Sequence, residues 1–215
     1  EPLIGNYGHY VLNVPLGQYA KVSFGNDNML YGEGQHVIHN QNFSVPEDYL
    51  VSQNASYINH KDIHVFNVKP GQYAKIRIGY EYYLLPPGNH KIRNVNLIFE
   101  ESTGFVSRTD LHIHNGNQHI FNIPVGKFCK IKIGQDYHLL DAGTHFIESA
   151  NLSFDPTTDF VDQTNLHINH GNIHILNIPK GKMALVFENN EPRILFSGQH
   201  VINNANFKFD EMTKL

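Results

Sequence analysis

The sequence predicts an all-β protein made of four tandem antiparallel β repeats, each about 55 residues long, that are stacked or paired. Three observations lead to this prediction. One motif recurs four times at a shift of 54 or 55 residues, apolar residues alternate with polar residues inside each copy, and glycine or asparagine stands at each expected turn. Because no segment shows an apolar stripe of helical period over three turns, we expect no long helix.

The repeat is defined by short motifs at fixed offsets. A short proline-containing turn closes in each copy at a glycine, namely Gly17, Gly71, Gly126 and Gly181. A G-x-H motif begins seventeen residues later, with its histidine at His36, His90, His145 and His200. These offsets place the four copies at residues 1–50, 51–105, 106–160 and 161–215. A unit of this size buries little surface alone, so we expect neighbouring copies to stack or to share strands.

Composition limits the classes of function. The chain has 215 residues, of which 40% are hydrophobic, with a net charge of −4 and one cysteine. The apolar content excludes a disordered chain, the acidic balance argues against a general nucleic-acid binder, and a single thiol excludes a disulfide-stapled scaffold. No apolar run approaches the ~18 residues of a membrane-spanning helix. The sequence starts at Glu1 without an initiator methionine or a leader, so we expect a processed chain or an excised fragment.

An opening hairpin is expected at the start of each copy. In the third copy, Asn115-Gly116 has the composition of a two-residue type I′ loop, from which the strand residues pair outward. In the fourth copy, a loop at His170-Gly171 is expected to act in the same way. The two predicted cross-strand pairs are His112 with His119 and His167 with His174.

The strand after each proline-containing turn shows a period of two. In the third copy the apolar set is Cys129, Ile131 and Ile133, and the opposite set is Phe128, Lys130 and Lys132. A residue that tolerates positive φ follows this strand in every copy, at Gly25, Gly79, Gly134 and Asn189. An apolar pair and a strand that opens with the G-x-H motif come next. Each copy should therefore be a small antiparallel sheet of about five strands.

The repeated unit is similar to two known families. The stretch I-P-V-G-K-F-C-K-I-K-I-G…L-L-D-A-G-T-H-F-I resembles the repeat of the major vault protein and also the opening β segment of the Band 7 group, the stomatins and prohibitins. Tandem repetition favours the vault-type comparison. The long helix of the vault family and the membrane segment of Band 7 proteins are both absent from the sequence. The resemblance implies a scaffold or interaction role and transfers no catalytic residue.

Histidine is unusually abundant, with 15 residues. Two imidazoles at opposed strand positions are close enough to share a metal ion, so His112, His119, His167 and His174 are candidate metal ligands. The other copies have Tyr57 with His64, and Leu3 with Tyr10. Because a repeated metal site does not normally exchange a ligand for leucine, we favour a packed or hydrogen-bonded aromatic layer. The same layer supports an alternative function, a metal- or pH-responsive binding protein whose stability falls between about pH 7 and 5.

The sequence predicts no catalytic residue, no enzyme activity and no cofactor. Cys129 corresponds to Ala20, Ala74 and Ala184 in the other copies, which is typical of a small core position. The histidine of each G-x-H motif is expected to bond a backbone group beside its turn, because exposed turn backbone needs partners.

The best candidate for a partner-binding surface lies in the fourth copy. The first three copies carry Lys21, Lys75, Arg77, Lys130 and Lys132 on one outward strand face, as either a basic stripe for an anionic partner or a solvated face. The fourth copy carries Met183, Leu185 and Phe187 instead, and an apolar outer face is typical of an interface.

Taken together, these patterns predict a non-enzymatic scaffold or protein-interaction module that binds a protein partner or associates with itself. We expect no nucleic acid and no membrane span, and a small-molecule ligand stays open. A cytoplasmic location is expected, and a bacterial secreted effector delivered into a host cell is also compatible with the sequence.

Overall fold

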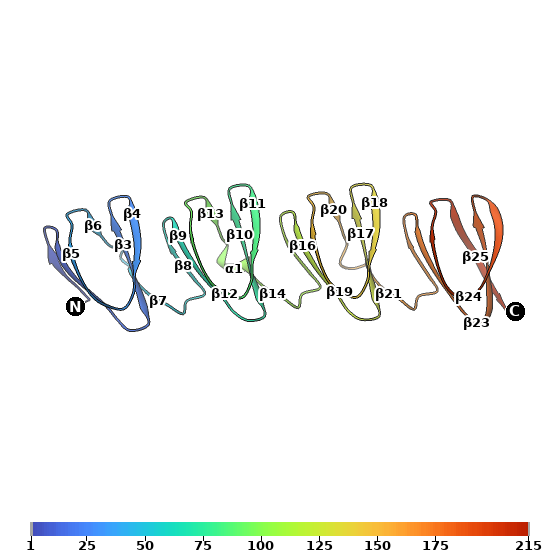
Figure 1. Ribbon diagram of the computed structural model, residues 1–215, viewed down its shortest axis with the longest axis horizontal. Helices are drawn as coiled ribbons and strands as arrows, with labels where there is room; N and C mark the ends of the chain where they lie inside the picture. The colour runs from blue at the N-terminus through green and yellow to red at the C-terminus, as the bar shows by residue number, and fades with distance from the viewer. Residues whose placement is uncertain (1, 215) are drawn as a thin grey trace. The chain divides into compact units, whose positions relative to one another are not determined.

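A computed structural model of the chain describes residues 2–214 and the side chains of residues 2–210. It confirms the all-β prediction, because every strand pairing in the described part is antiparallel (Figure 1). The chain divides into two compact units, and the boundary in the sequence lies between Thr109 and Asp110. Each unit contains strands from two copies of the repeat. The four copy boundaries given above stay a prediction. The strands Leu50–Ser52, Phe105–Ser107 and Phe160–Asp162 cross these boundaries, and each is described with the copy whose sheet it joins.

The first unit contains copies one and two. Copy one contributes β1 (Leu3–Asn6), β2 (His9–Val14), β3 (Gln18–Phe24), β4 (Asp27–Tyr31), β5 (Gly34–His39), β6 (Phe43–Ser44) and β7 (Leu50–Ser52). Copy two contributes β8 (Tyr57–His60), β9 (Ile63–Val68), β10 (Gln72–Ile78), β11 (Glu81–Leu85), β12 (Gly88–Arg93), β13 (Leu97–Ile98), the single helical turn α1 (Glu101–Gly104) and β14 (Phe105–Ser107).

The second unit contains copies three and four. Copy three contributes β15 (His112–Asn115), β16 (Gln118–Ile123), β17 (Lys127–Ile133), β18 (Asp136–Leu140), β19 (Gly143–Glu148), β20 (Leu152–Ser153) and β21 (Phe160–Asp162). Copy four contributes the longer strands β22 (His167–His170), β23 (Ile173–Glu188), β24 (Glu191–Asn203) and β25 (Phe207–Lys214).

Each of the first three copies contains two sheets rather than the single sheet of about five strands that the sequence suggested. In copy one, β1, β2 and β5 form a three-stranded sheet, whereas β3 pairs with β4, β6 and β7 in a second sheet. The chain passes from the first sheet to the second through Pro15 and Gly17. Proline cannot donate to a strand ladder, and Gly17 has a φ of +73°, so the strand stops at Val14 and restarts in a new direction.

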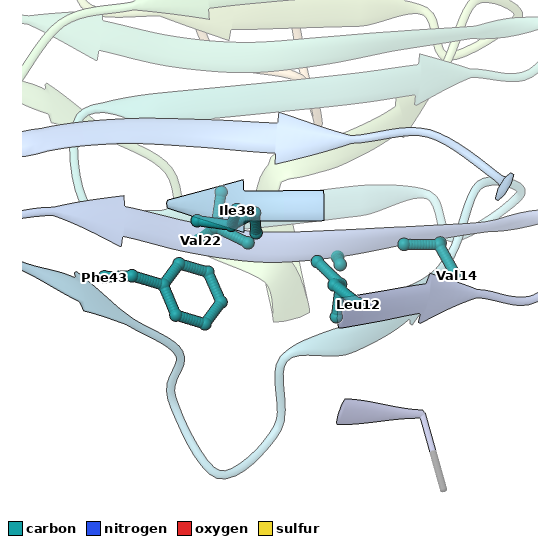
Figure 2. Packing of buried hydrophobic residues seen from close by; sticks show 6 residues of the cluster. Leu12, Val14, Val22, Ile38 and Phe43 are labelled. Atoms are coloured by element: carbon teal, nitrogen blue, oxygen red, sulfur yellow. The ribbon is translucent and has the colours of Figure 1, made fainter. Parts of the chain in front are cut away.

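The core of each copy lies between its two sheets. In copy one, Leu12 and Val14 of the first sheet are buried against Ala20 and Val22 of the second, and Phe43 closes the cluster (Figure 2). In copy three the corresponding cluster is Phe121, Ile123, Cys129 and Ile131. The predicted inward face of the third-copy strand is therefore confirmed. Alternation within β17 turns its other side chains away from this core.

Copy four differs because its strands run through both sheets. β23 pairs with β24 from Ile173 to Glu188, and the register shifts between Ile178 and Met183, beside the proline-containing turn. β25 then pairs along the second half of β23. The predicted turn at Asn189 is confirmed, because Asn189 and Asn190 have φ values of +53° and +67° between β23 and β24.

The predicted register of the opening hairpins is wrong by one residue on each strand. The third-copy loop is Gly116-Asn117, so Asn115 pairs with Gln118 and His114 pairs with His119. Gly116 takes the first loop position with a φ of +60°, which is where type II′ turns place glycine. In the fourth copy Gly171, with a φ of +61°, has the same effect. The predicted histidine partners are consequently diagonal neighbours on one sheet face.

The helical content of the described residues is small. No helix among them is long and apolar enough to cross a lipid bilayer.

Candidate functional site

The predicted apolar residues of copy four lie on one face of the β23–β24 ladder. The register pairs Met183 with Phe196, Leu185 with Ile194, and Phe187 with Pro192. Ala184, Val186 and Leu195 alternate with them and are buried in the core on the opposite side. The tail face, as we call this surface, consists of Met183, Leu185, Phe187, Pro192, Ile194 and Phe196.

Exposure differs between the two strands of the tail face. Met183, Leu185 and Phe187 are half-buried, whereas Ile194 and Phe196 are 56% and 60% exposed. The sequence prediction named the β23 side of this surface and missed the β24 side. The turn at Asn189-Asn190 is the sequence signal that could have found Ile194 and Phe196, because a tight hairpin there fixes which β24 residues stand beside β23.

The equivalent face of copy one is covered by the opening hairpin of copy two. Ile58, Ile63 and Val65 of the β8–β9 hairpin are buried, and Tyr19, Leu30 and Val51 of copy one pack against them. We call a hairpin in this position a docking hairpin. Its buried apolar side chains hold the two copies of the first unit together.

Polar contacts surround the apolar centre of this contact. The loop histidine His60 donates from Nε2 to the carbonyl oxygen of Val22 at 2.8 Å. The Asn28 side chain donates to Asp62 at 2.8 Å, and Arg93 donates to the carbonyl oxygen of Asn28 at 2.8 Å. Burial lowers the pKa of His60 and is the largest cause, although the bond to Val22 acts in the opposite direction.

The second unit repeats this docking. His170 stands at the same hairpin position as His60 and donates from Nε2 to the carbonyl oxygen of Ile131 at 2.7 Å. Its ring meets the Tyr137 ring edge to face at 4.9 Å between centroids. Ile168 and Ile175 of this hairpin are buried. The sequence reasoning missed the role of the loop histidines, because single residues in a turn carry no periodic signal.

Two lysines of the basic outward face have side-chain partners within their own copies. Lys21 of copy one is paired with Asp48 at 2.7 Å, and its side chain is 13% exposed. Lys132 of copy three lies over the ring of Tyr137, with Nζ 5.1 Å from the centroid. These two lysines are therefore engaged by neighbouring side chains.

The four candidate metal ligands form two hydrogen-bonded histidine pairs. Nε2 of His112 lies 3.1 Å from Nδ1 of His119, and Nε2 of His167 lies 3.2 Å from Nδ1 of His174. The ring planes are nearly parallel, at 3° and 15°. Their diagonal placement brings the ring nitrogens to hydrogen-bond distance although the strand positions are not directly opposed.

The backbone beside the third-copy pair fixes its proton arrangement. Nε2 of His119 lies 3.3 Å from the carbonyl oxygen of Ser149, which only accepts, so Nε2 carries the proton and Nδ1 is an acceptor. His112 therefore donates to His119. In copy two the hydroxyl of Tyr57 is the donor, at 2.8 Å from Nδ1 of His64. The aromatic layer expected from the sequence is thus also a hydrogen-bonded layer.

The fourth copy keeps this arrangement with one difference. The backbone of Asn204 lies near His174 and raises its pKa, in the way that Ser149 does for His119. That contact lacks the geometry of a hydrogen bond, so Nε2 of His174 is buried without a partner.

Burial keeps these imidazoles neutral. Desolvation is the largest cause that lowers the pKa of His112, to about 4, with further lowering from His119 and His114. Desolvation also lowers the pKa of His64, His119, His167 and His174. A neutral imidazole is a possible metal ligand, but each pair supplies only two nitrogens. Among the described residues, no group of three or more His, Cys, Asp or Glu side chains is placed to hold a metal ion, and the metal site stays a prediction.

The expected role of the G-x-H histidines is confirmed in all four copies. Each Nε2 lies 2.8 Å from a carbonyl oxygen four residues earlier in the chain. The pairs are His36 with Gly32, His90 with Pro86, His145 with Asp141, and His200 with Phe196. These histidines close the loop before the last long strand of the copy.

Cys129 is a core residue, as its alanine counterparts suggested. It is fully buried, and desolvation raises the pKa of its thiol to about 12, so the thiol stays protonated and the nucleophilic thiolate does not form at neutral pH. Cys129→Ala should lower the free energy of unfolding by about 1–2 kcal/mol at most, measured by urea unfolding. Ile131→Ala, in the same cluster, is the contrasting variant and should cost about 2–5 kcal/mol. An equal loss from both variants would contradict a small-residue site.

Comparison with known proteins finds two relatives for part of the chain. Vacuolin-B and Vacuolin-A of Dictyostelium discoideum are each 42% identical to it over 82 residues. The chain is similar to vacuolins over this segment. The match covers 38% of this chain but 14% of each relative, so the chain spans a small part of their length. No family model and no solved structure matches the chain. The finding agrees with a Band 7-like or vault-related repeat as a broad group and does not confirm the vault repeat itself.

Proposed function

We propose that this chain is a non-enzymatic β-repeat scaffold that binds other proteins through the outer faces of its sheets. The supporting observation is the docking of one copy on another, which occurs in both units. In each case an outer sheet face receives a hairpin through buried apolar residues and a loop histidine bonded to the backbone. The fold therefore already uses this face to receive another copy of the repeat within the same chain, which supports the proposal.

The tail face is the strongest candidate for a partner site. Copy one has Lys21, Ser23 and Asn28 where copy four has Leu185, Phe187 and Pro192. The face of copy one thus adds these polar residues to its apolar centre, whereas a more extensive apolar face such as that of copy four is typical of association with a separate molecule. We place the scaffold in the cytoplasm, with a protein partner and without a cofactor or nucleic acid. The two vacuolins support the proposal through 82 matched residues.

The pair Leu185→Lys and Phe187→Lys tests this site. Copy three carries Lys130 and Lys132 at the same two positions, so lysine there is compatible with the fold. With a photoreactive residue in place of Phe196, the parent protein should cross-link to a protein in extracts of its own cells. The double variant should lose about 90% of that product, because two charges would be desolvated in the interface. Unchanged solubility and cross-linking in the double variant would overturn the site, and no cross-linked protein from the parent would overturn the scaffold.

A second candidate function is a pH-responsive binding protein, favoured by the paired imidazoles. A neutral pair shares one N–H···N bond, whereas two protonated rings have no acceptor between them. Acid would therefore loosen copies three and four and any partner bound to them. The metal-binding form of this function is tested by elemental analysis of the purified protein.

A further inference from the structure

We propose that the tail face binds the opening hairpin β1–β2 of a second copy of this chain. This inference deepens the scaffold function and rests on it, because it names the occupant of the candidate site. Two pieces of structure define the contact. One is the tail face, and the other is the head hairpin, which comprises β1, the loop Tyr7-Gly8 and β2.

The head hairpin has the residues of a docking hairpin but is not covered. Ile4 is 55% exposed, whereas its counterparts Ile58 and Ile168 are 1% and 2% exposed in the two docked hairpins. Val11 corresponds to Val65 and Ile175, which are also buried there. The head hairpin therefore has apolar residues, Ile4 and Val11, at the two positions that are buried in the docked hairpins.

The tail face is the counterpart of the surfaces that receive those hairpins. Met183 corresponds to Tyr19, and Ile194 corresponds to Leu30. In copy one, Tyr19 and Leu30 pack on the β8–β9 hairpin. The occupant of the equivalent face is therefore seen in both units, and in each unit it is the opening hairpin of another copy of the repeat. A hairpin of this type is the partner that the tail face fits.

The loop residues agree in size with this pairing. In the first unit Lys61, with a φ of +55°, donates from Nζ to Oγ of Ser23, which pairs with Asn28 across the receiving ladder. In the second unit Gly171, the counterpart of Lys61, lies against Tyr137, the larger counterpart of Asn28. The first unit thus combines a large loop residue with a small receiving residue, and the second unit combines a small loop residue with a large receiving residue. The head has Tyr7, with a φ of +46° and 89% exposure, and the tail has the compact Pro192 at the position of Asn28. At the Asn28 position the pair follows the pattern of the first unit, while Phe187 takes the place of Ser23.

The loop position of His60 and His170 is occupied by Asn6 in the head hairpin. An asparagine amide has two N–H donors, so it can replace the imidazole N–H that bonds a carbonyl oxygen of the receiving strand. The head thus keeps a donor at the point where both docked hairpins use one.

Binding of head to tail is a heterologous association. The two surfaces differ, so an open assembly of any size still offers one free head and one free tail, and it grows as a chain or closes into a ring. A contact of two tail faces would instead be symmetric and would stop at a dimer. This difference allows the two arrangements to be separated by mutation.

The test uses a head variant, Ile4→Lys with Val11→Lys, and a tail variant, Leu185→Lys with Ile194→Lys, studied by sedimentation velocity over a concentration series. The parent chain should exceed its monomer mass of 24.5 kDa as concentration rises. Each variant alone should remain a monomer, with at least a tenfold weaker association. An equimolar mixture should form a dimer and nothing larger, because only one compatible head and tail remain.

Val37→Lys is the matched control. Val37 stands beside Val11 on β5, and copy two has Lys91 at this position in a docked sheet, so the substitution should leave association unchanged. Circular dichroism checks that each variant keeps its β structure. Self-association lost in the tail variant alone would indicate tail-to-tail contact and overturn the proposal. A parent chain that stays monomeric at all concentrations would also overturn it, while a cross-linked foreign protein at the tail face would still support the scaffold function.

Discussion

Alanine at Gly171 should destabilise the second unit by about 3 kcal/mol, measured as the free energy of unfolding in urea. Gly171 has a φ of +61°, a conformation that costs a side-chain-bearing residue about 1–2 kcal/mol. A Cβ at this position would also lie 2.3 Å from Cδ2 of Tyr137. The ring must move from the contact between copies three and four, and overpacking of this kind costs a further 1–3 kcal/mol or so.

Gly134→Ala separates the two causes of this loss. Gly134 has a φ of +60° in the same unit, but a Cβ there would have no neighbour within 4 Å. It should therefore cost about 1–2 kcal/mol, the backbone contribution alone. In a Tyr137→Ala background, Gly171→Ala should cost the same small amount, because the obstructing ring is gone. Equal losses for the two alanine variants in the parent protein would contradict the proposed packing between loop and ring.

The all-β fold could be predicted from the sequence because its signals are local and repeated. Alternation in the third copy placed Cys129 and Ile131 in the core, and glycine or asparagine at fixed offsets marked the turns. The division into two sheets could not be predicted, because it depends on the direction of the chain after Pro15 and Gly17. The register error at Gly116 has a related cause, since Asn-Gly fits one turn and a glycine at the first position fits another.

The candidate site was predictable in part for similar reasons. Met183, Leu185 and Phe187 stood out by comparison with lysines in the other copies, and the structure places them on one face. Ile194 and Phe196 depended on strand pairing, which a single strand does not show. The loop histidines His60 and His170 act between copies, and a contact of that kind leaves no period in the sequence. Their role becomes visible only when the neighbouring copy is in place.

Acid should destabilise the protein through its paired histidines, and His112→Tyr should remove about 2–3 kcal/mol of that effect. The pKa of His112 is about 4 in the folded protein, against about 6.5 for an unfolded chain. Above pH 6.5 the ring is neutral in both states and adds no pH dependence. Between pH 6.5 and 4 the unfolded chain binds a proton that the folded protein does not, so the free energy of unfolding falls as pH falls. Below about pH 4 both states are protonated, and this contribution stops changing.

The tyrosine variant is designed on copy two, where the Tyr57 hydroxyl donates to Nδ1 of His64 as His112 donates to His119. His112→Tyr therefore removes a titrating ring and keeps the hydrogen bond. His119 and His114 lower the pKa of His112, and His114 also lowers the pKa of His119. His112→Tyr leaves His114 and His119 in place. Urea unfolding is measured at pH values from 7 to 4.5. This range lies above the titration of Asp48, Asp62 and Asp155 in the folded protein, because their pKa values are lowered below 3.8.

The reverse substitution supplies the stronger test. Tyr57→His adds a third diagonal histidine pair, located in the first unit, so the loss of stability between pH 7 and 4.5 should become steeper than in the parent protein. A flatter profile in His112→Tyr together with a steeper one in Tyr57→His would assign the acid sensitivity to the diagonal pairs, because the two variants change the number of paired imidazoles in opposite directions. Parallel profiles for both variants and the parent would instead mean that the pairs take up protons as readily when folded as when unfolded, and the pH-responsive function would lose its physical basis.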